Sequence, residues 1–521
     1  MKFIVALCAF VLATIVGNPR VATAAAFQVE ETTISNVRKA LQANQVTCRQ
    51  VVQAYLDRIS AYDHQGPTLA AILTLNSKAL AEAERLDAVY ARSGPVGPLH
   101  CIPLVLKDNY NTADLPTTGG SASLAGAQPQ SDAFVVAKLR NAGAIILGKS
   151  NMHEFAQGGL TISSLGGQTL NPYDLTRTPG GSSGGTAAAV AANFCVAGTG
   201  SDTVNSIRSP ASANALVGIR PTKGLLSRAG IMPVSETQDA IGPIARTVTD
   251  AARLLQVMAG YDPNDSSTAW NVGNTPTDYA SFLKQNGLRD ARIGVLKIML
   301  GIGPEHQEVN AVMARAIEAM KKGGAVIVEI DAPRLDAAQL IADNDVQKYE
   351  FKTLIDAYLA TIPQAPVKSL AEIIASEKFH KPSLEKFLLS AQAYQNGMEE
   401  PDYKERLLRN QRTRQTLISL MAEHRLDALV YPLQKRLVVP VTETSQTDRN
   451  GILAAVTGFP AITVPAGFSR PSSTAPLGVP VGMDILGRPW SEGRLIQIAY
   501  GFEQATHYRK SPESAPSLHR N

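Results

Sequence analysis

The chain has 521 residues, of which 45% are hydrophobic and 18% are charged, and its formal net charge at pH 7 is +4. This composition is that of a globular protein with enough apolar residues for a large core, and it excludes a disordered or low-complexity chain. The sequence has no long basic run and no interleaving of basic with aromatic residues, so it predicts no nucleic-acid partner.

The first 24 residues predict a secretory signal peptide. A basic start at residues 1–2 precedes an apolar run of 15 residues, FIVALCAFVLATIVG, and residues 22–24, ATA, have the small-residue pattern of a cleavage site. The alternative is an N-terminal membrane anchor, which needs roughly 20 apolar residues. We therefore expect export to the periplasm or the medium, a mature chain of residues 25–521, and no stable membrane insertion.

The mature chain alternates between helical and strand-like segments. Residues 32–60 carry apolar residues at three- and four-residue spacings, which predicts two helices broken near Asn44. Residues 76–94 predict a helix that ends at Gly94. The further predicted elements are a short strand (102–108), a helix and a buried strand (132–150), a strand–helix–strand unit (291–331), and buried strands at 426–432 and 461–468.

This alternation predicts an α/β domain with a mixed, mostly parallel sheet that is covered by helices on both faces. The stretch from about 335 to 425 is polar and helical in pattern and has no strand signal. We expect it to be a helical insertion on the sheet. No internal repeat and no long Pro/Gly/Ser linker divides the chain, so the sequence predicts one large domain over residues 25–521.

The cysteines leave two alternatives open. Cys8 belongs to the predicted signal peptide, and Cys48, Cys101 and Cys195 remain in the mature chain. These three allow one bridge with one free thiol, or three buried thiols, and the second alternative is the simpler one. There is no CxxC, no HExxH and no cluster of histidines, so the sequence predicts no metal site and no cofactor.

Three stretches carry residues that suggest chemistry. IPLVLKDN (102–109) ends an apolar run with Lys107, and burial of a lysine lowers its pKa and makes a neutral amine available as a base. PGGSSGG (179–185) precedes an alanine-rich helical segment, and GTGSDTVNSIRSP (198–210) follows closely. Neither loop has the GK[ST] ending of a phosphate loop or the G-x-S-x-G elbow. Each stretch alone also fits an ordinary strand end, turn or linker.

Together these stretches resemble the amidase signature family. NPYDLTRTPGGSSGGTAAAVAA followed by GTGSDTVNSIRSPASANALVGIRPTKGLLSR resembles the core block of that family. Further segments that resemble the family occur in the family's order: IPLVLKDNYNTADLPTTGGS, AGAIILGKSNMHEFA, SRAGIMPVSETQDAIGPIARTVTDAARLL, GFPAITVPAGF and LGVPVGMDILGRPW. The resemblance covers nearly the whole mature chain and implies the amidase signature fold.

The resemblance implies a catalytic set of two serines and a lysine. It assigns the catalytic lysine to Lys107, the bridging serine, which the family holds with a cis peptide bond, to Ser182, and the nucleophile to Ser206. A serine hydroxyl is a poor nucleophile until a base takes its proton. Neither His100 nor His153, the nearest histidines in sequence, occupies a family position. Ser182 would therefore relay the proton from Ser206 to Lys107 and later return it to the leaving amine.

The resemblance also assigns residues around the substrate. It places the oxyanion hole at the backbone N–H groups of residues 203–206, which are Thr203, Val204, Asn205 and Ser206. It places one wall of the acyl pocket at the backbone of Ala156. The family typically has two glycines where this chain has Val204 and Asn205. A β-branched valine does not adopt the left-handed region, so we expect this backbone to differ in detail from the family. The two side chains line or narrow the pocket, or Val204 points away and nothing changes.

The function implied by the resemblance is an exported, cofactor-free serine hydrolase that cleaves a C–N amide bond through an acyl-enzyme. The segments GLLSRAGIMPVSETQDAIGPIARTVTDAARLL and YEFKTLIDAYLA are most similar to the peptide-amidase-type branch, which favours C-terminal amides, aryl acylamides or similar small amides. For Arg208, a structural salt bridge is favoured over binding of a substrate carboxylate. Both a monomer and a homodimer stay open.

Three alternative functions stay open beside this one. The first is a hydrolase of broad range that also accepts esters and carbamates. The second is the glutaminase subunit of a tRNA-dependent amidotransferase, which works in the cytoplasm with partner subunits and therefore conflicts with the predicted signal peptide. The third is a catalytically silent exported binding protein, which the intact set of Lys107, Ser182 and Ser206 disfavours.

Overall fold

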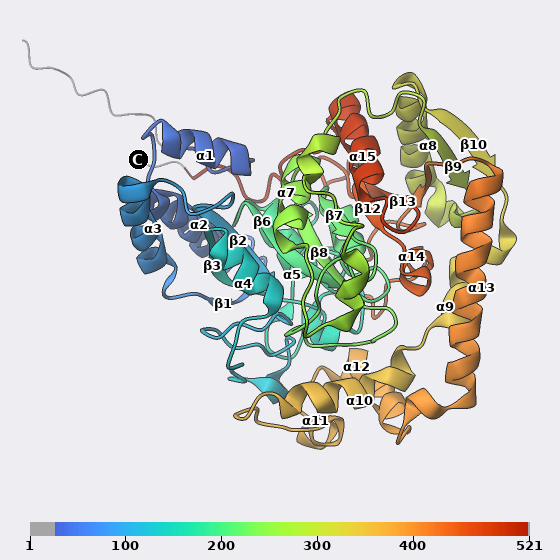
Figure 1. Ribbon diagram of the computed structural model, residues 1–521, viewed down its shortest axis with the longest axis horizontal. Coiled ribbons are helices and arrows are strands. Elements are labelled where there is room, and N and C mark those ends of the chain that lie inside the picture. The colour runs from blue at the N-terminus through green and yellow to red at the C-terminus, as the bar shows by residue number, and fades with distance from the viewer. Residues whose placement is uncertain (1–26, 519–521) are drawn as a thin grey trace, which may run out of the picture.

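A computed structural model describes residues 27–518 of the chain (Figure 1). The predicted signal peptide, residues 1–24, lies outside these residues. None of the helices in the described part of the chain combines the length and the apolar character needed to span a bilayer.

A mixed sheet runs through the described residues and has 11 strands in the order β1-β3-β2-β6-β8-β7-β12-β13-β11-β9-β10. A separate two-stranded sheet consists of β4 and β5. The strand bounds are β1 Ile72–Leu75, β2 Ile102–Lys107, β3 Ala144–Ser150, β4 Ile162–Ser163, β5 Gly167–Gln168, β6 Ala197–Asp202, β7 Val217–Arg220, β8 Ala240–Ala245, β9 Arg292–Leu296, β10 Val326–Ile330, β11 Ala428–Pro432, β12 Ala461–Phe468 and β13 Pro480–Leu486.

The sheet is mixed, as predicted, but parallel pairs do not predominate in it. Strand β2 is parallel to β3 and β6, and β9 is parallel to β10 and β11. The other neighbouring pairs of this sheet are antiparallel. The reason lies in the connections, because β7–β8 and β12–β13 are consecutive strands joined by loops without a crossover helix.

The predicted N-terminal helices are present. Helices α1 (Ile34–Gln42) and α2 (Cys48–Tyr62) are separated at Asn44, whose φ is 51°. Thr33 caps the first helix with its side chain, and Thr47 caps the second. The following helices up to the strand–helix–strand unit are α3 Ala79–Ser93, which ends at Gly94 as predicted, α4 Phe134–Asn141, α5 Gly184–Ala191, α6 Arg208–Ala213 and α7 Val248–Met258.

Helices cover both faces of the sheet, and strand β11 shows how the sequence achieves this. Side chains of a strand alternate between the two faces. Ala428 and Val430 belong to the apolar cluster that includes α8 (Gln307–Lys322) and α15 (Glu492–Thr506). Leu429 and Tyr431 belong to the cluster that includes α13 (Pro401–Glu423) and α14 (Ile452–Thr457). Every residue of β11 is buried, which explains its continuous apolar run.

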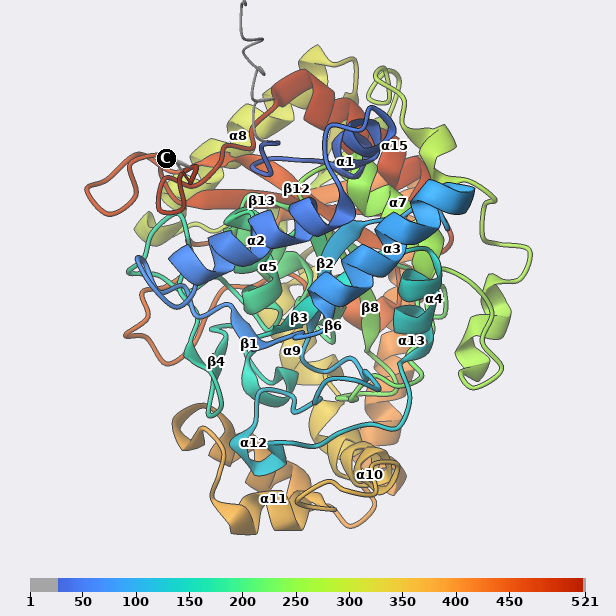
Figure 2. The same cartoon turned by 90° about the vertical axis from the view of Figure 1, so that its left-hand side faces the viewer.

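The predicted helical insertion is present and contains no strand. It consists of α9 Ala337–Asn344, α10 Gln347–Ala360, α11 Leu370–Ser376, α12 Lys381–Gln392 and α13 Pro401–Glu423. In both views of the molecule, α10, α11 and α12 lie together at one end of the body (Figures 1 and 2). Their apolar side chains share a cluster with Phe155, Ala156 and Met232 of the main body. The insertion therefore packs on loops that follow the sheet strands.

Cys48 and Cys101 form a disulfide, with their Cα atoms 5.2 Å apart, and Cys195 is a buried free thiol. The favoured prediction of three buried thiols is therefore wrong. The first residue of α2 lies against the residue that precedes β2, a proximity hidden by a separation of 53 positions. Within residues 27–518, only these two cysteines and His100 group closely enough to hold a metal ion, and the disulfide uses both sulfurs.

Candidate active site

Lys107 is the last residue of β2, an interior strand with all six residues buried. Its side chain is 0% exposed. The Nζ atom donates hydrogen bonds to the Ser182 Oγ at 2.7 Å and to the Ser201 Oγ at 2.8 Å. Burial lowers the pKa of Lys107 to about 7, because the charged ammonium loses its hydration. A large fraction of this amine is therefore neutral near pH 7.

Ser201 also contacts Lys107, and the sequence motifs did not predict this contact. Its Oγ bonds the lysine and also accepts a hydrogen bond from the Asn109 Nδ2 at 2.9 Å. Thr199, two residues earlier on the same face of β6, accepts the backbone N–H of Lys107 at 3.3 Å. The sequence does carry a signal for this contact: hydroxyl side chains stand at alternate positions of a completely buried strand. Because buried polar groups need partners, these hydroxyls predict a polar neighbour on that face of the strand.

Ser182 lies in the glycine-rich loop directly before α5. The peptide bond between Gly181 and Ser182 is cis. The Ser182 carbonyl accepts the backbone N–H of His153 at 2.9 Å, which fixes the loop against the segment after β3. Close packing requires glycine at the start of the helix, since a Cβ on Gly185 would lie 2.2 Å from the Asn151 carbonyl oxygen. The glycine-rich sequence therefore forms a closely packed, buried loop.

Ser206 lies in the turn between β6 and α6 and is 5% exposed. Its carbonyl accepts the backbone N–H of Ser183 at 3.2 Å, so this turn contacts the loop that carries Ser182. The Ser182 Oγ accepts a hydrogen bond from the Lys107 Nζ. The structure therefore brings the three residues of the predicted set to one place, with the lysine and Ser182 in direct contact.

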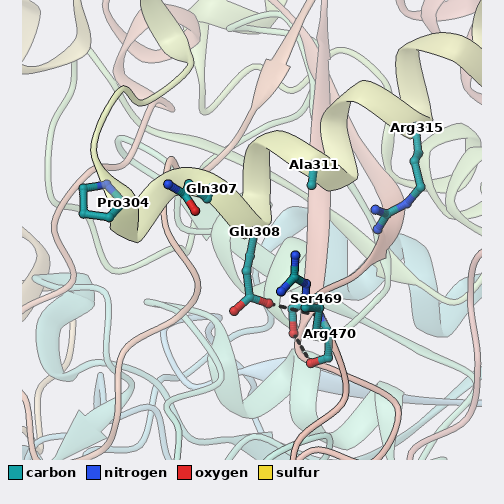
Figure 3. A pocket seen from close by; sticks show the side chains of 7 residues that line it. All are labelled: Pro304, Gln307, Glu308, Ala311, Arg315, Ser469 and Arg470. Atoms are coloured by element: carbon teal, nitrogen blue, oxygen red, sulfur yellow. Dashed lines mark hydrogen bonds between the residues drawn. The ribbon is translucent and has the colours of Figure 1, made fainter.

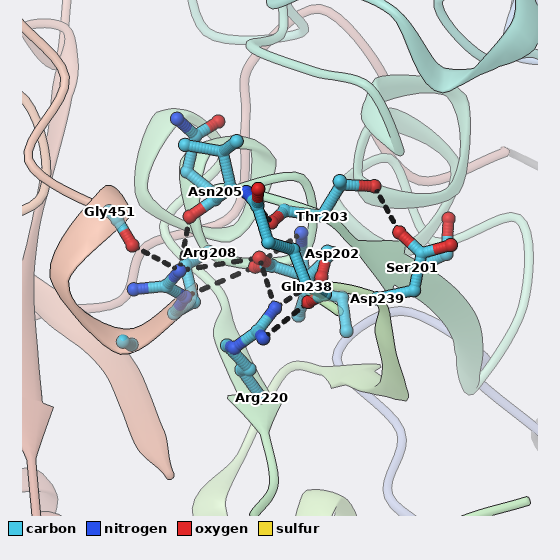
Figure 4. A network of polar contacts seen from close by, with 12 residues as sticks. Ser201, Asp202, Thr203, Asn205, Arg208, Arg220, Gln238, Asp239 and Gly451 are labelled. Atoms are coloured by element: carbon cyan, nitrogen blue, oxygen red, sulfur yellow. Dashed lines mark hydrogen bonds and ion pairs between the residues drawn. The ribbon is translucent and has the colours of Figure 1, made fainter. Parts of the chain in front are cut away.

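A buried network of ion pairs holds the Ser206 turn (Figure 4). The Asp202 carboxylate accepts from the Arg208 Nε at 3.1 Å and from the Arg220 Nη1 at 2.9 Å. Arg208 also pairs with Asp484 at 2.7 Å. Burial alone would raise the pKa of Asp202, but the two guanidinium groups lower it to about 2. Arg208 thus forms structural ion pairs, as favoured from the sequence, and is not available for substrate.

The loop predicted as the oxyanion hole has unpaired backbone donors. The N–H groups of residues 203–206 donate no hydrogen bond within the described part of the chain, whereas the next one, of Ile207, donates to the Asp202 Oδ2 at 3.1 Å. The Thr203 hydroxyl donates to the Asp239 Oδ1 at 2.6 Å, and the Val204 carbonyl accepts from the Arg208 Nη2 at 2.6 Å. The turn is thus fixed by other groups, and its N–H groups stay free for a ligand.

Val204 and Asn205 occupy this loop without a left-handed backbone, since neither has a positive φ. Val204 is partly buried and packs against the apolar cluster beneath α14. Asn205 is 1% exposed, and Gly451 provides the room for it. A Cβ on Gly451 would lie 2.4 Å from the Asn205 Cβ and 2.7 Å from the Val204 carbonyl oxygen. A glycine on the facing segment thus accommodates the side chain at position 205.

Ala156 and a cleft lie on the side of the helical insertion. Ala156 has a φ of 60°, is 5% exposed and belongs to the cluster shared with α10–α12. The cleft has a volume of about 500 Å³ and reaches from Ser201 and Thr203 to Tyr358 of α10. Apolar side chains are among its lining residues, and Arg228, Glu236, Asp239 and Asp265 supply charge. Ser201, which contacts Lys107, lines this cleft, whereas Lys107 itself does not.

A second cleft, of about 320 Å³, lies elsewhere, between α8 and the end of β12 (Figure 3). Figure 3 shows Glu308 beside Arg470, whose backbone N–H donates to the Glu308 Oε2 at 3.0 Å. None of the predicted site residues lines this cleft.

Residues 50–496 match the family model for amidases. A probable amidase of Arabidopsis thaliana is 36% identical over 506 residues, which cover 94% of this chain and 92% of that protein. A glutamyl-tRNA(Gln) amidotransferase component of Moorella thermoacetica is 36% identical over 486 residues, with coverage of 91% and 96%. The native peptide amidase of Stenotrophomonas maltophilia has a TM-score of 0.83 and 37% identity, covering 93% of this chain and 99% of its own.

Proposed function

This chain belongs to the amidase family, and from that premise we propose that it cleaves its substrate through an acyl-enzyme on Ser206, with Lys107 as base and Ser182 as proton relay. It is a hydrolase acting on C–N amide bonds. The observation that carries the proposed mechanism is the 2.7 Å hydrogen bond between the Lys107 Nζ and the Ser182 Oγ, at a buried lysine that has no ion-pair partner among the described residues.

In the proposed acylation step, the neutral Lys107 amine takes the proton of Ser182 while Ser182 takes that of Ser206. The Ser206 Oγ then attacks the amide carbonyl carbon, and negative charge develops on the carbonyl oxygen. The free backbone N–H groups of residues 203–206 are in the right loop to stabilise this oxyanion. Each such donor is worth roughly 10²–10³ in rate in other hydrolases.

The second half of the proposed reaction reverses the direction of the proton. The Lys107 ammonium returns its proton through Ser182 to the leaving nitrogen. This step is needed because the nitrogen leaves as a neutral amine and not as an anion. The C–N bond breaks and the acyl group stays on Ser206. Water then attacks this ester with Lys107 again as base, which releases the carboxylic acid and regenerates the serine.

We extend the proposal to substrate and location. The similarity to a peptide amidase and the apolar residues that line the 500 Å³ cleft support small amides, among them C-terminal amides and aryl acylamides. The Cys48–Cys101 disulfide supports export, since disulfides persist in oxidising compartments. Residues 1–24 would direct this export as a signal peptide.

The test of the proposal is covalent labelling with a serine-directed sulfonyl fluoride or phosphonate. We expect one label per chain, on the peptide that contains Ser206 by mass spectrometry, with loss of amide hydrolysis in the same proportion. Ser182→Ala should slow both labelling and hydrolysis. Ser183→Ala is the matched control, because the Ser183 Oγ donates to the Ser201 carbonyl at 3.3 Å and does not contact the lysine. Full hydrolytic activity in Ser206→Ala would exclude the mechanism.

A second candidate function follows from the relatives that are components of glutamyl-tRNA(Gln) amidotransferases, at 32–37% identity. Under this candidate the chain would release ammonia from glutamine for partner subunits. Measuring the release of ammonia and amines by the isolated protein decides between the two. Hydrolysis of amides, anilides or carbamates without a partner supports the amidase, whereas activity on glutamine that needs partner subunits supports the second candidate.

A further inference from the structure

Arg449 presents an unpaired positive charge beside the Ser206 turn. It lies in the segment between β11 and α14, is partly buried, and its Nη1 donates to the Asn205 Oδ1 at 3.1 Å. No carboxylate in the described part of the chain comes within 4.0 Å of its guanidinium nitrogens. Burial lowers the pKa of Arg449 to about 10, which still leaves it protonated at neutral pH.

The other arginines at this turn are satisfied in a different way. Arg208 and Arg220 are completely buried, and both pair with Asp202. Removing a charge from water is costly unless a counter-charge compensates it. Arg449 carries the same charge and makes a single hydrogen bond to a neutral amide. Its remaining guanidinium N–H groups donate to nothing within residues 27–518.

Two consecutive glycines bring Arg449 close to the loop of Ser182. A Cβ on Gly159 would lie 2.5 Å from the Arg449 Nη1, and a Cβ on Gly158 would lie 2.3 Å from the His153 Cε1. On its other side, Gly159 packs against Gly181, where an added Cβ would meet the Gly159 carbonyl carbon at 2.9 Å. The guanidinium is therefore separated from the loop of Ser182 by one layer of backbone.

The polar groups around Arg449 offer donors without acceptors. The Asn205 Nδ2 is buried and has no hydrogen-bond partner among the described residues, and the same holds for the His153 Nε2. The His153 Nδ1 accepts the backbone N–H of Leu160 at 3.2 Å, which assigns the proton of the neutral ring to Nε2. Buried polar atoms of this kind need an explanation, because more than nine in ten are paired. An oxygen-rich anion would satisfy them.

We propose that Arg449 and Asn205 form a subsite for a carboxylate of the amide substrate, next to the nucleophile. The planar guanidinium suits a carboxylate, since two parallel N–H···O bonds match its geometry. Asn205 has two roles: its Oδ1 orients the guanidinium, and its Nδ2 is a further donor. The inference rests on the proposed function, because it assumes that the substrate amide is cleaved at Ser206.

The test compares amides that differ in one charge. Succinamate and glutaramate carry a carboxylate, and the matching diamides succinamide and glutaramide do not. We expect kcat/KM to favour the carboxylate substrate about 10- to 100-fold, the range of a charge-assisted hydrogen bond. Arg449→Gln should reduce this ratio to about one, and Arg449→Lys should keep part of it. Arg334→Gln makes the same charge change at an exposed arginine and should keep the full ratio.

The ratio separates substrate binding from a structural role. If Arg449→Gln lowers kcat/KM equally for both substrates, or leaves the ratio unchanged, the inference is wrong. If this variant does not fold, the native protein decides with an amide that carries an ammonium group in place of the carboxylate. That compound should be at least tenfold poorer than the neutral diamide, and equal rates overturn the inference.

A binding measurement separates this inference from the proposed mechanism. Calorimetry on Ser206→Ala should show tighter binding of succinamate than of succinamide, and equal affinity overturns the subsite. If the native protein hydrolyses no amide but succinamate binds more tightly, the mechanism fails and the subsite stands. If neutral amides are hydrolysed without any preference for a carboxylate, the mechanism stands and the subsite fails.

Discussion

Lys107 and Lys149 are both completely buried, on the neighbouring parallel strands β2 and β3, yet their surroundings differ. The Lys149 Nζ pairs with the Asp108 Oδ1 at 3.3 Å and donates to the Thr117 Oγ1 at 2.8 Å. The Lys107 Nζ contacts two serine hydroxyls and has no carboxylate partner within reach of an ion pair in the described residues. Burial lowers the pKa of both lysines.

The difference shows that burial alone does not make a lysine a base. Burial is the larger effect on the pKa of Lys149 and lowers it, but the Asp108 carboxylate, 3.3 Å away, acts in the opposite direction and favours the charged ammonium. At Lys107 the neighbouring hydroxyls are neutral and can exchange protons with the amine. A buried amine becomes a catalytic candidate when its partners are neutral and able to exchange protons.

The largest expected effect is loss of activity on replacing Lys107. Lys107→Met removes the amine at similar volume, and we expect kcat to fall at least about 10³-fold, since general-base catalysis contributes about 10²–10⁴ and also supports the leaving group here. Steady-state hydrolysis of a chromogenic anilide measures it, with a thermal unfolding scan to confirm that the variant is folded. A loss below tenfold would remove Lys107 from the proposed mechanism.

Next in size is the cost to stability of replacing Lys149. Lys149→Met leaves the buried Asp108 carboxylate without its ion-pair partner, and we expect a loss of about 3–5 kcal/mol in the free energy of unfolding. Denaturant unfolding measures the loss. The double variant Asp108→Asn/Lys149→Met should recover most of it, because both charges are then gone. If the single variant unfolds like the native protein, the ion pair with Asp108 does not distinguish Lys149 from Lys107.

The smallest expected effect is the pH dependence that Lys107 gives to the hydrolysis rate and to the stability of the fold. The amine acts as base in its neutral form, so kcat/KM should rise about tenfold per pH unit up to a pKa of about 7 and then level off. The ordinary pKa of lysine is 10.5, so between about pH 7 and 10.5 the unfolded chain binds the extra proton and stability rises with pH. Lys107→Met should abolish this rise in stability, which denaturant unfolding at several pH values measures. A kcat/KM that falls as the pH passes through 7 would contradict the role of Lys107 as base.

Much of the site could be predicted because its residues sit inside short, ordered motifs. Lys107 follows an apolar strand, and Ser182 and Ser206 lie in loops at the ends of α5 and β6, so the order of these motifs and their resemblance to a family located them. The helices near the N-terminus were predictable from apolar spacing and from caps such as Thr33. The helical insertion was predictable because its pattern contains no strand.

The remaining features depend on contacts between distant segments. Arg449 reaches Asn205 across 244 positions, and no local pattern relates the two. Cys48 and Cys101 meet because α2 packs beside β2, which depends on the three-dimensional arrangement. The balance of parallel and antiparallel pairs was equally hidden, because strand direction follows from loop paths such as that between β7 and β8.

The close contact between Gly451 and Asn205 makes these two positions a coupled pair. Any larger side chain at 451 collides with the one at 205, and a glycine at 205 would leave two glycines facing each other across an empty space about the size of an asparagine side chain. Mutational libraries that restore glycines at 204 and 205 should therefore vary position 451 at the same time. A library that varies the side chain at 205 while keeping 451 fixed tests only the side chains that fit against this glycine.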